Sequence, residues 1–286
     1  MKSLLSRLSS LGLGDLQDTD IYEDEKAAKK AAEKKQPPKK IQVQEKNLIF
    51  EKNFDCPVCH ADFTNKVLMT GKARLIGMDR DLRPLHDVVD TQKYDVIMCP
   101  HCGYAGLKRF FPYVTDGQRK LVREHICEKI QLNEYDGDTY SYEECVERYQ
   151  IALACAVVKH GRASEKAYIC LKTAWLLRGY VEEIAINSDG ISDFAKELQE
   201  QEEEYLRSAY TGFLEARQSE NFPMCGMDEH TIDYLLAALA THFGEYDTAG
   251  KLVSKIITSK TANTRTKDKA RDLRDDILRG LKKDKE

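Results

Sequence analysis

The sequence predicts an α+β protein in which a small β-rich module precedes an all-helical domain, and two observations support this. Between residues 48 and 116, short apolar runs and turn residues surround two closely spaced cysteine pairs. From residue 117 onward, apolar residues recur every three or four positions, which is the period of an amphipathic helix. We therefore divide the chain into a flexible leader (1–47), a β-rich module (48–116) and a helical domain (117–286).

The leader offers little apolar surface to bury. Its leucines at helical spacing stop at Gly12 and Gly14, and the run from Lys26 to Lys40 consists mostly of Lys, Ala and Glu. Such a stretch cannot offset the roughly 1–2 kcal/mol per residue that ordering the backbone costs. Nowhere does an apolar run approach the roughly 20 residues of a membrane-spanning helix. We therefore expect a flexible tether, no membrane span and a cytoplasmic protein.

Three strand signals define the β-rich module. The stretch from Asn47 to Phe54 alternates weakly before the first cysteine pair. Apolar triplets at 67–69 and 74–76 flank Gly71, which predicts a hairpin or a bulge there. Alternating residues from Tyr94 to Met98 run directly into the second pair, as in a strand that delivers a metal-binding turn.

The two Cys-Pro-x-Cys pairs, Cys56/Cys59 and Cys99/Cys102, are the clearest chemical signal in the sequence. Two residues between the thiols allow both sulfurs of a pair to point at one ion while amides of the turn donate hydrogen bonds to them. Gly103 follows the second pair and tolerates the positive φ of such a turn. The sequence therefore predicts a zinc-ribbon-like module with one metal site, whose ligands are Cys56, Cys59, Cys99 and Cys102.

Four thiolates fill every position of a tetrahedral site, so we expect a structural zinc ion. Thiolate tetrahedra also accept iron, which is the alternative metal. A redox dithiol would need a βαβ context, which the residues around the first pair do not supply. His60 and His101 stand beside the two pairs and are expected to face solvent or to lie behind the ligands. The other five cysteines are scattered through helical pattern, which favours a reducing compartment.

Helical periodicity predicts a series of helices in the second domain. One of them begins with Ser141-Tyr-Glu-Glu144, the signature of a capping box. The others are expected at about 117–133, 164–183, 192–218, 228–243, 246–259 and 265–282.

The turn between the helices at 228–243 and 246–259 resembles that of a tetratricopeptide repeat. Gly244 ends the first helix, Tyr246 begins the second, and Ala249 lets the two cross closely. A weaker copy, with one extra residue in its turn, runs through Gly161. We therefore predict a tetratricopeptide-like helical domain, with a simple helical bundle as the alternative.

The net charge of −4 is unevenly distributed along the chain. Residues 48–117 carry 9 Lys and Arg against 9 Asp and Glu, residues 118–250 carry 13 against 25, and residues 251–286 carry 12 against 6. Nucleic-acid binding needs a concentrated basic face, so the neutral metal-binding module disfavours it. The acidic middle of the chain instead favours a basic protein or peptide partner.

Two further groups of residues are candidates for function. The segment between the cysteine pairs predicts a surface ion-pair network, with a polar functional groove as the alternative, because it contains Asp79, Asp81, Asp87, Asp90, Arg74, Arg80, Arg83 and His86. Cys225 precedes a helix N-terminus, which would lower the pKa of its thiol. A buried turn cysteine, with Asp228 capping the helix, is the simpler interpretation.

Several of these stretches resemble a known family. Both cysteine turns, the run from Arg74 to Pro84, and the segments 222–229 and 267–273 are similar to the bacterial domain of unknown function 2225 family. The resemblance covers about residues 48–282. It implies a cytoplasmic bacterial protein with a zinc-ribbon-like part, tetratricopeptide-like helices and the four cysteines as ligands. It assigns no activity and no catalytic residue.

Together these observations predict a non-enzymatic zinc-binding adaptor or scaffold that engages a protein partner through a groove between its helices. We find no phosphate-binding loop, no nucleophile elbow and no His-Glu-x-x-His motif, so no catalytic residue is predicted. A nucleic-acid-binding zinc ribbon is the second interpretation, and a rubredoxin-like iron electron carrier or metalloenzyme is the third. The sequence names neither the partner nor the oligomeric state.

Overall fold

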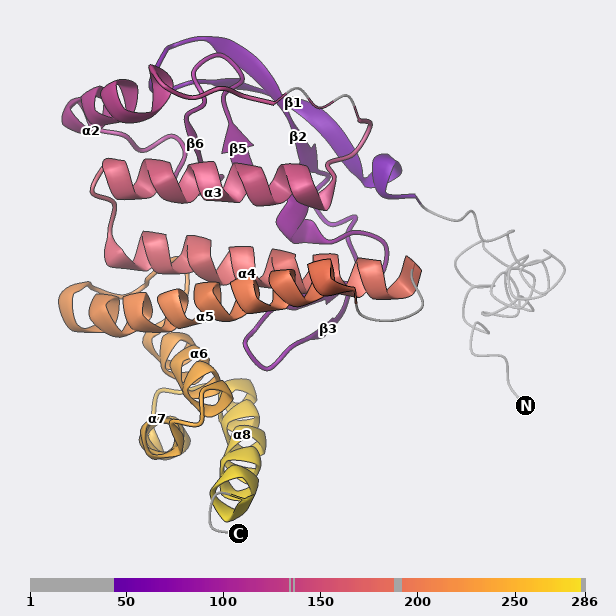
Figure 1. Cartoon of the computed structure of the whole chain (residues 1–286). Helices are drawn as coiled ribbons and strands as arrows, with labels where there is room; N and C mark the ends of the chain where they lie inside the picture. Colours follow the sequence, from indigo (N-terminus) through magenta and orange to yellow (C-terminus); the bar gives the residue numbers. More distant parts are fainter. Residues whose placement is uncertain (1–43, 134, 136, 188–191, 284–286) are drawn as a thin grey trace, which may run out of the picture. The chain divides into compact units, whose positions relative to one another are not determined.

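A computed structural model of the chain describes residues 44–133, 135, 137–187 and 192–283. Residues 1–43, which make up most of the predicted leader, lie outside this part. The described residues confirm the α+β class, because a small region of antiparallel strands carries the cysteines and is followed by helices (Figure 1).

The strand region consists of three two-stranded antiparallel sheets. Strand β1 (Ile49–Asp55) pairs with β2 (Asp62–Leu68) along its whole length. Strand β3 (Leu75–Met78) pairs with β4 (Pro84–His86), and β5 (Val96–Met98) pairs with β6 (Ala105–Leu107). Short 3-10 helices at Glu45–Leu48 and Thr91–Tyr94 precede β1 and β5.

Two details of the strand prediction are wrong. Gly71 (φ +74°) lies in the connection between β2 and β3, which belong to different sheets, so the hairpin predicted around it does not form. The partner of β2 is β1, because that pairing buries Phe63 and Val67 on one face. Tyr94 belongs to a 3-10 helix and not to β5, since the Asp90 carboxylate accepts the amide of Gln92 at 2.9 Å and caps that helix.

Seven α-helices follow in the described residues: α2 (Asp116–Val122), α3 (Tyr142–Val158), α4 (Ala163–Asn187), α5 (Asp193–Ser219), α6 (Glu229–His242), α7 (Tyr246–Thr258) and α8 (Thr264–Lys283). A π-helical turn at Arg123–Cys127 continues α2, so the helix predicted at 117–133 ends early. Ser141 caps α3 by accepting the amide of Glu144 at 3.1 Å. The predicted capping box is only half formed, because the Glu144 carboxylate lies beside Arg148 at 3.4 Å.

The turns that join the helices close with hydrogen bonds of the Schellman type. After α6, the amide of Glu245 donates to the Ala240 carbonyl at 2.8 Å, and Gly244 adopts φ +73°. After α3, the amide of Gly161 makes the equivalent bond, and His160 takes the positive φ of +51°. In the turn after α3, the glycine therefore comes one residue after the position that needs positive φ. This accounts for the extra residue that the sequence shows in that turn.

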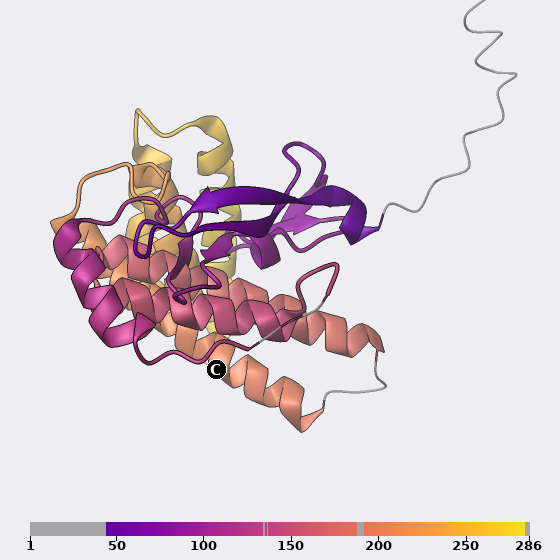
Figure 2. The same ribbon diagram turned by 90° about the horizontal axis from the view of Figure 1, so that it is seen from above.

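Helix α3 connects the strand region to the other helices. It contacts β5 and β6 and also packs along α4. Its Tyr149 is fully buried and donates from its hydroxyl to the Gln92 carbonyl at 2.9 Å. Figure 2 shows the strands, in indigo and purple, along one side of the helices. Residues Gln44–Glu286 form one compact unit.

Three groups of buried side chains hold this unit together. One lies among α4 to α8, a second lies between β5, β6, α3 and α4, and the third surrounds the four cysteines. None of the described helices is long and apolar enough to cross a membrane.

We expect Gly244→Ala to lower the free energy of unfolding by about 1–2 kcal/mol, because a Cβ is unfavourable in the left-handed region. The substitution meets no atom within 4 Å, so strain is its main effect. Gly250→Ala is the matched control, since it also meets open space but lies inside α7. It should raise the free energy of unfolding by about 0.5–1 kcal/mol. Urea denaturation measures both, and a gain at Gly244 would contradict the helix-turn assignment.

Candidate metal centre

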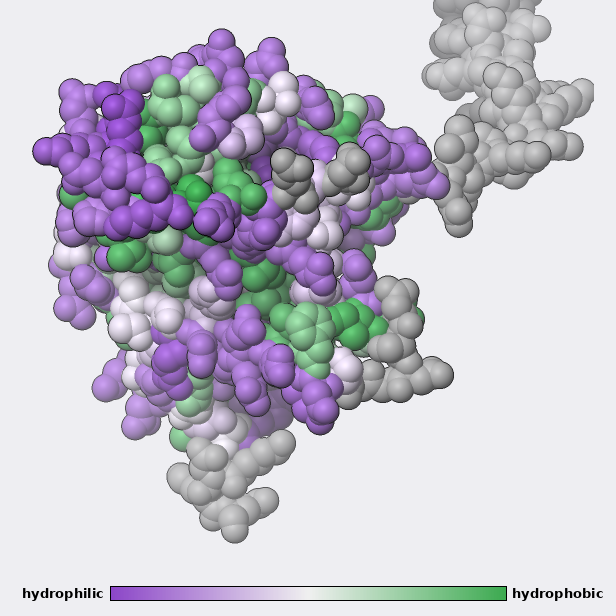
Figure 3. All heavy atoms as spheres, turned by 45° about the horizontal axis from the view of Figure 1, so that its top comes forward, coloured by the Kyte–Doolittle hydropathy of each residue, from purple (hydrophilic) through white to green (hydrophobic). Residues whose placement is uncertain are grey.

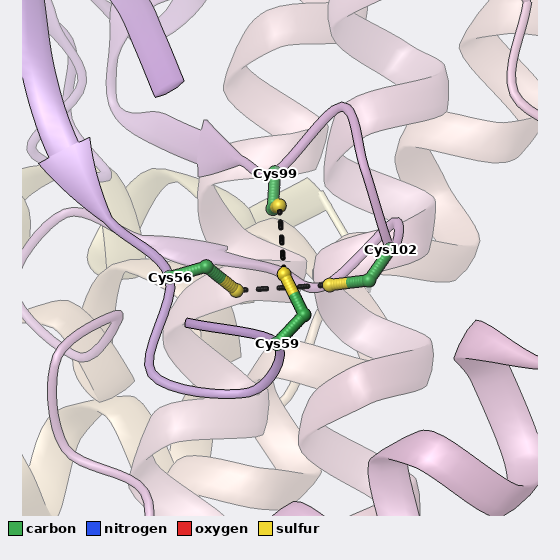
Figure 4. Close-up of side chains that lie close together, drawn as sticks. All are labelled: Cys56, Cys59, Cys99 and Cys102. Carbon is green, nitrogen blue, oxygen red and sulfur yellow. Dashed lines mark hydrogen bonds between the residues drawn. The ribbon is translucent and has the colours of Figure 1, made fainter. Parts of the chain in front are cut away.

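The four cysteines that the sequence singles out converge on one point. Their Sγ atoms all lie within 4.8 Å of one another, and the side chains point toward a common centre (Figure 4). The Sγ atoms of Cys56 and Cys102 are 3.6 Å apart, as are those of Cys59 and Cys99. A thiolate tetrahedron with metal–sulfur bonds of about 2.3 Å has edges of about 3.8 Å. The cluster can therefore hold one metal ion.

The two cysteine turns have the same backbone structure. Cys56 directly follows β1, and Cys99 directly follows β5. The carbonyl of each accepts the amide four residues later, that of His60 or of Gly103, at 2.9 Å. The amide of each donates to the carbonyl five residues later, at 3.0 and 2.9 Å. The shared turn presents both thiols of a pair on one side.

This turn requires a positive φ at its fifth residue. His60 adopts φ +62° and Gly103 adopts φ +72°. At Gly103 the surroundings add a second constraint, because a Cβ there would come within 2.7 Å of the Ile130 side chain. Glycine is therefore needed at 103 for both conformation and space, as the sequence indicated for the conformation alone.

Helix α2 and the π-helical turn fasten the first cysteine turn. Arg119 donates from Nε to the Pro57 carbonyl at 2.7 Å, and Arg123 donates from Nε to the Val58 carbonyl at 3.0 Å. Both carbonyls lie between the two cysteines of that turn. The sequence prediction did not include these two arginines, although their spacing of four on a predicted helix indicates a shared face.

The donor set fits a cation. Cys56, Cys99 and Cys102 are buried and Cys59 is half-buried, and the amide of Val58 donates to the Cys56 sulfur at 3.4 Å. Hydrogen bonds with Cys102 and Cys99 lower the pKa of Cys56, whereas the hydrogen bonds with Cys56 and Cys99, together with burial, raise the pKa of Cys102. Four thiols so close together cannot all ionise without a compensating positive charge. A bound metal cation would supply it.

The model of a bacterial family matches residues 49–277. Its description reads "Uncharacterized protein conserved in bacteria (DUF2225)". The chain belongs to this family. The match spans both cysteine turns and continues into α8, so the strand region and the helices are parts of the same DUF2225 unit. No curated protein and no solved structure matches the chain.

Other potential ligands near the DUF2225 cysteines lie outside the cluster of four. His60 and His101 are exposed at the tips of the two turns, as expected. Cys127, in the π-helical turn, lies beside the cluster: burial raises the pKa of its thiol, and a hydrogen bond with Cys102 opposes that effect. No spacing in the sequence indicated this fifth thiol.

The aspartates between the cysteine pairs form ion pairs, both within their own segment, where Asp79 pairs with Arg83 at 3.6 Å, and with residues far away in the sequence. Arg178 of α4 pairs with Asp79 at 3.0 Å, with Asp81 at 2.8 Å and with Glu202 of α5 at 2.7 Å. Asp81 is buried, so the network is not confined to the surface as predicted. Asp90 lies elsewhere, where burial raises its pKa.

The surroundings of Cys225 favour a structural role over a reactive thiol. Its thiol donates to the Ser164 carbonyl at 3.2 Å, and burial raises the pKa of Cys225 to about 12. Asp228 caps α6 by accepting the amide of Thr231 at 2.7 Å. The simpler interpretation fits better, because Asp228 caps the helix as predicted and the pKa of the Cys225 thiol is raised, although Cys225 is half-buried and not fully buried.

We expect Gly103→Ala to destabilise the protein by about 2 kcal/mol or more, since left-handed strain costs about 1–2 kcal/mol and the overlap with Ile130 adds to it. His60→Ala places the same residue at the same position of the other turn. It should change the free energy of unfolding by less than about 0.5 kcal/mol, because His60 is exposed and already adopts positive φ. Denaturation of both variants in the presence of zinc tests this, and equal losses would contradict it.

Proposed function

We propose that this DUF2225 protein is a cytoplasmic, non-enzymatic adaptor in which a structural zinc ion holds the two cysteine turns together. The closed set of four sulfurs supports this proposal, because it leaves no ligand position for water or substrate. Three of the four cysteines are buried, which favours a structural zinc over an iron that exchanges electrons at the surface. The zinc supplies folding free energy, and the partner binds elsewhere.

The partner-binding surface that we propose is a cavity of about 470 Å³ among the helices, which we call the acidic groove. Its floor is apolar and is formed by Leu206, Ala238, Leu239 and Leu273. Its rim is charged and polar and includes Asp81, Arg178, Glu202, Thr241, His242 and Asp276. A floor and rim of this kind suit an amphipathic peptide, whose apolar side chains fill the floor.

The charge around the acidic groove favours a basic peptide. The rim arginines are already neutralised, since Arg80 pairs with Asp276 and Arg178 pairs with Glu202. The lining as a whole carries three carboxylates, those of Asp81, Glu202 and Asp276, against these two arginines, a net charge of −1. Lysines and arginines of a partner would complement this net negative charge.

Metal analysis tests the first half of the proposal. Purified protein should contain one zinc ion per chain and be colourless, whereas an iron protein would absorb visible light. Cys99→Ala should abolish zinc binding and lower the melting temperature strongly, because structural zinc contributes about 10–16 kcal/mol. Cys170→Ala also removes a buried thiol, but one outside the cluster, and should retain one zinc. Full zinc content in Cys99→Ala would refute the assignment.

A variant that blocks the acidic groove, together with a matched control that does not, tests the second half of the proposal. Thr241 and Thr258 each donate to the carbonyl four residues earlier at 2.8 Å, but only Thr241 lines the acidic groove. After photo-crosslinking in cells, partner segments rich in Lys and Arg should be recovered with the native protein and with Thr258→Lys. They should be lost with Thr241→Lys. Equal recovery with both variants, or partner segments without basic residues, would contradict the proposal.

A further inference from the structure

A second cavity, of about 420 Å³, is lined by more basic than acidic side chains. Most of its lining residues belong to the stretch 118–250, which is acidic overall. The segment after β6 and the turn between α3 and α4, at the left of Figure 1 below α2, contribute to its walls. We call it the basic cavity, and the residues on which the argument depends are Arg109, Phe110, Tyr113, Lys159, Arg162 and Glu165. Its volume falls within the range of small-molecule sites.

The basic cavity carries three permanent cations, Arg109, Lys159 and Arg162, against the single carboxylate of Glu165, a net charge of +2. Residues 118–250 as a whole carry 13 Lys and Arg against 25 Asp and Glu, a net charge of −12. A positive concavity in an acidic region concentrates field lines and attracts anions to one place.

The cations have different roles. Lys159 pairs with Glu165 at 2.7 Å, and their side chains are only 4% and 10% exposed, so this pair forms a fixed wall. Neither Arg109 nor Arg162 has a carboxylate within 4.0 Å among the described residues. Their guanidinium groups are therefore available to an external anion, for which the planar fork of arginine is well suited.

Arg109 is held in position and is not a freely rotating surface side chain. Its guanidinium group lies over the rings of Phe110 and Tyr168, 5.9 Å from each centroid. It also packs against Gly226, where an added Cβ would come within 2.6 Å of its nitrogen. This positioning reduces the entropy that the arginine loses when it binds a ligand.

An aromatic ring completes the basic cavity. Tyr113 lines it and is 75% exposed, whereas most other aromatic residues in the described part of the chain are buried or half-buried. An exposed flat ring beside unpaired guanidinium groups offers a stacking surface next to an anion site.

We propose that the basic cavity binds a mononucleotide, with its phosphate on Arg109 and Arg162 and its base stacked on Tyr113. Two unpaired arginines match the charge and geometry of a phosphate, and the ring matches a base. The volume accommodates one nucleotide. This site is separate from the zinc centre and from the acidic groove, and it does not depend on the proposed adaptor function.

Isothermal titration calorimetry of the full-length zinc-loaded protein tests the site. The probes are the four ribonucleoside 5′-monophosphates, the corresponding nucleosides and inorganic phosphate. At least one monophosphate should bind about tenfold more tightly than its nucleoside and than phosphate alone. Arg162→Gln and Arg109→Gln should each weaken that binding about tenfold. Tyr113→Ala should weaken the nucleotide several-fold and leave inorganic phosphate unchanged.

Arg265→Gln is the matched control, because Arg265 of α8 is also exposed and also lacks a carboxylate partner in the described part. It should bind the nucleotide as the native protein does. If Arg109→Gln fails to fold by circular dichroism, Arg162→Gln still decides the question. The proposal is overturned if no monophosphate binds below about 1 mM, if a nucleoside binds as tightly as its monophosphate, or if Arg162→Gln binds like the native protein.

Discussion

The meeting of four cysteine sulfurs within 4.8 Å is the constraint on which the strand region depends. Each of its three sheets has only two strands, and an isolated two-stranded hairpin is marginally stable at best. The cysteine turns follow β1 and β5, so one ion would tie the first sheet to the last. Thiolates at this distance repel one another unless a cation lies between them, so binding of an ion by this cluster would be coupled to folding.

The helices contribute side chains to the core of the strand region. Cys155 of α3 and Val122 of α2 are buried in the same group as the four cysteines, together with the rings of Phe63 and Phe111. The other face of the strand region packs on Tyr149 and its neighbours in α3 and α4. The strand region therefore has no core of its own that is separate from the helices, which agrees with a family match that spans both.

Both candidate binding surfaces use residues from the strand region. The lining of the acidic groove includes Arg80 and Asp81 from the connection between β3 and β4. The lining of the basic cavity includes Arg109 and Tyr113 from the segment after β6. The remaining walls come mostly from helices. Neither surface includes any of the four cysteines in its lining.

The sequence by itself determined which four cysteines come together and where the helices lie, because both are local patterns. A spacing of two residues between thiols and a period of 3.6 residues between apolar positions need no knowledge of distant partners. Positive φ after the second cysteine pair was likewise readable from Gly103.

Tertiary structure alone decided strand pairing, ion-pair partners and cavities. The hairpin or bulge predicted at Gly71 did not form, because β2 pairs with β1 and its apolar face packs against the side chains around the cysteines, which the turn residues do not determine. Arg178 meets Asp79 and Asp81 across nearly a hundred residues, and no local pattern encodes such an encounter. The basic cavity is the clearest case, since its charge is visible only after folding brings Arg109, from the neutral stretch 48–117, to the same cavity as Arg162, from the acidic stretch 118–250.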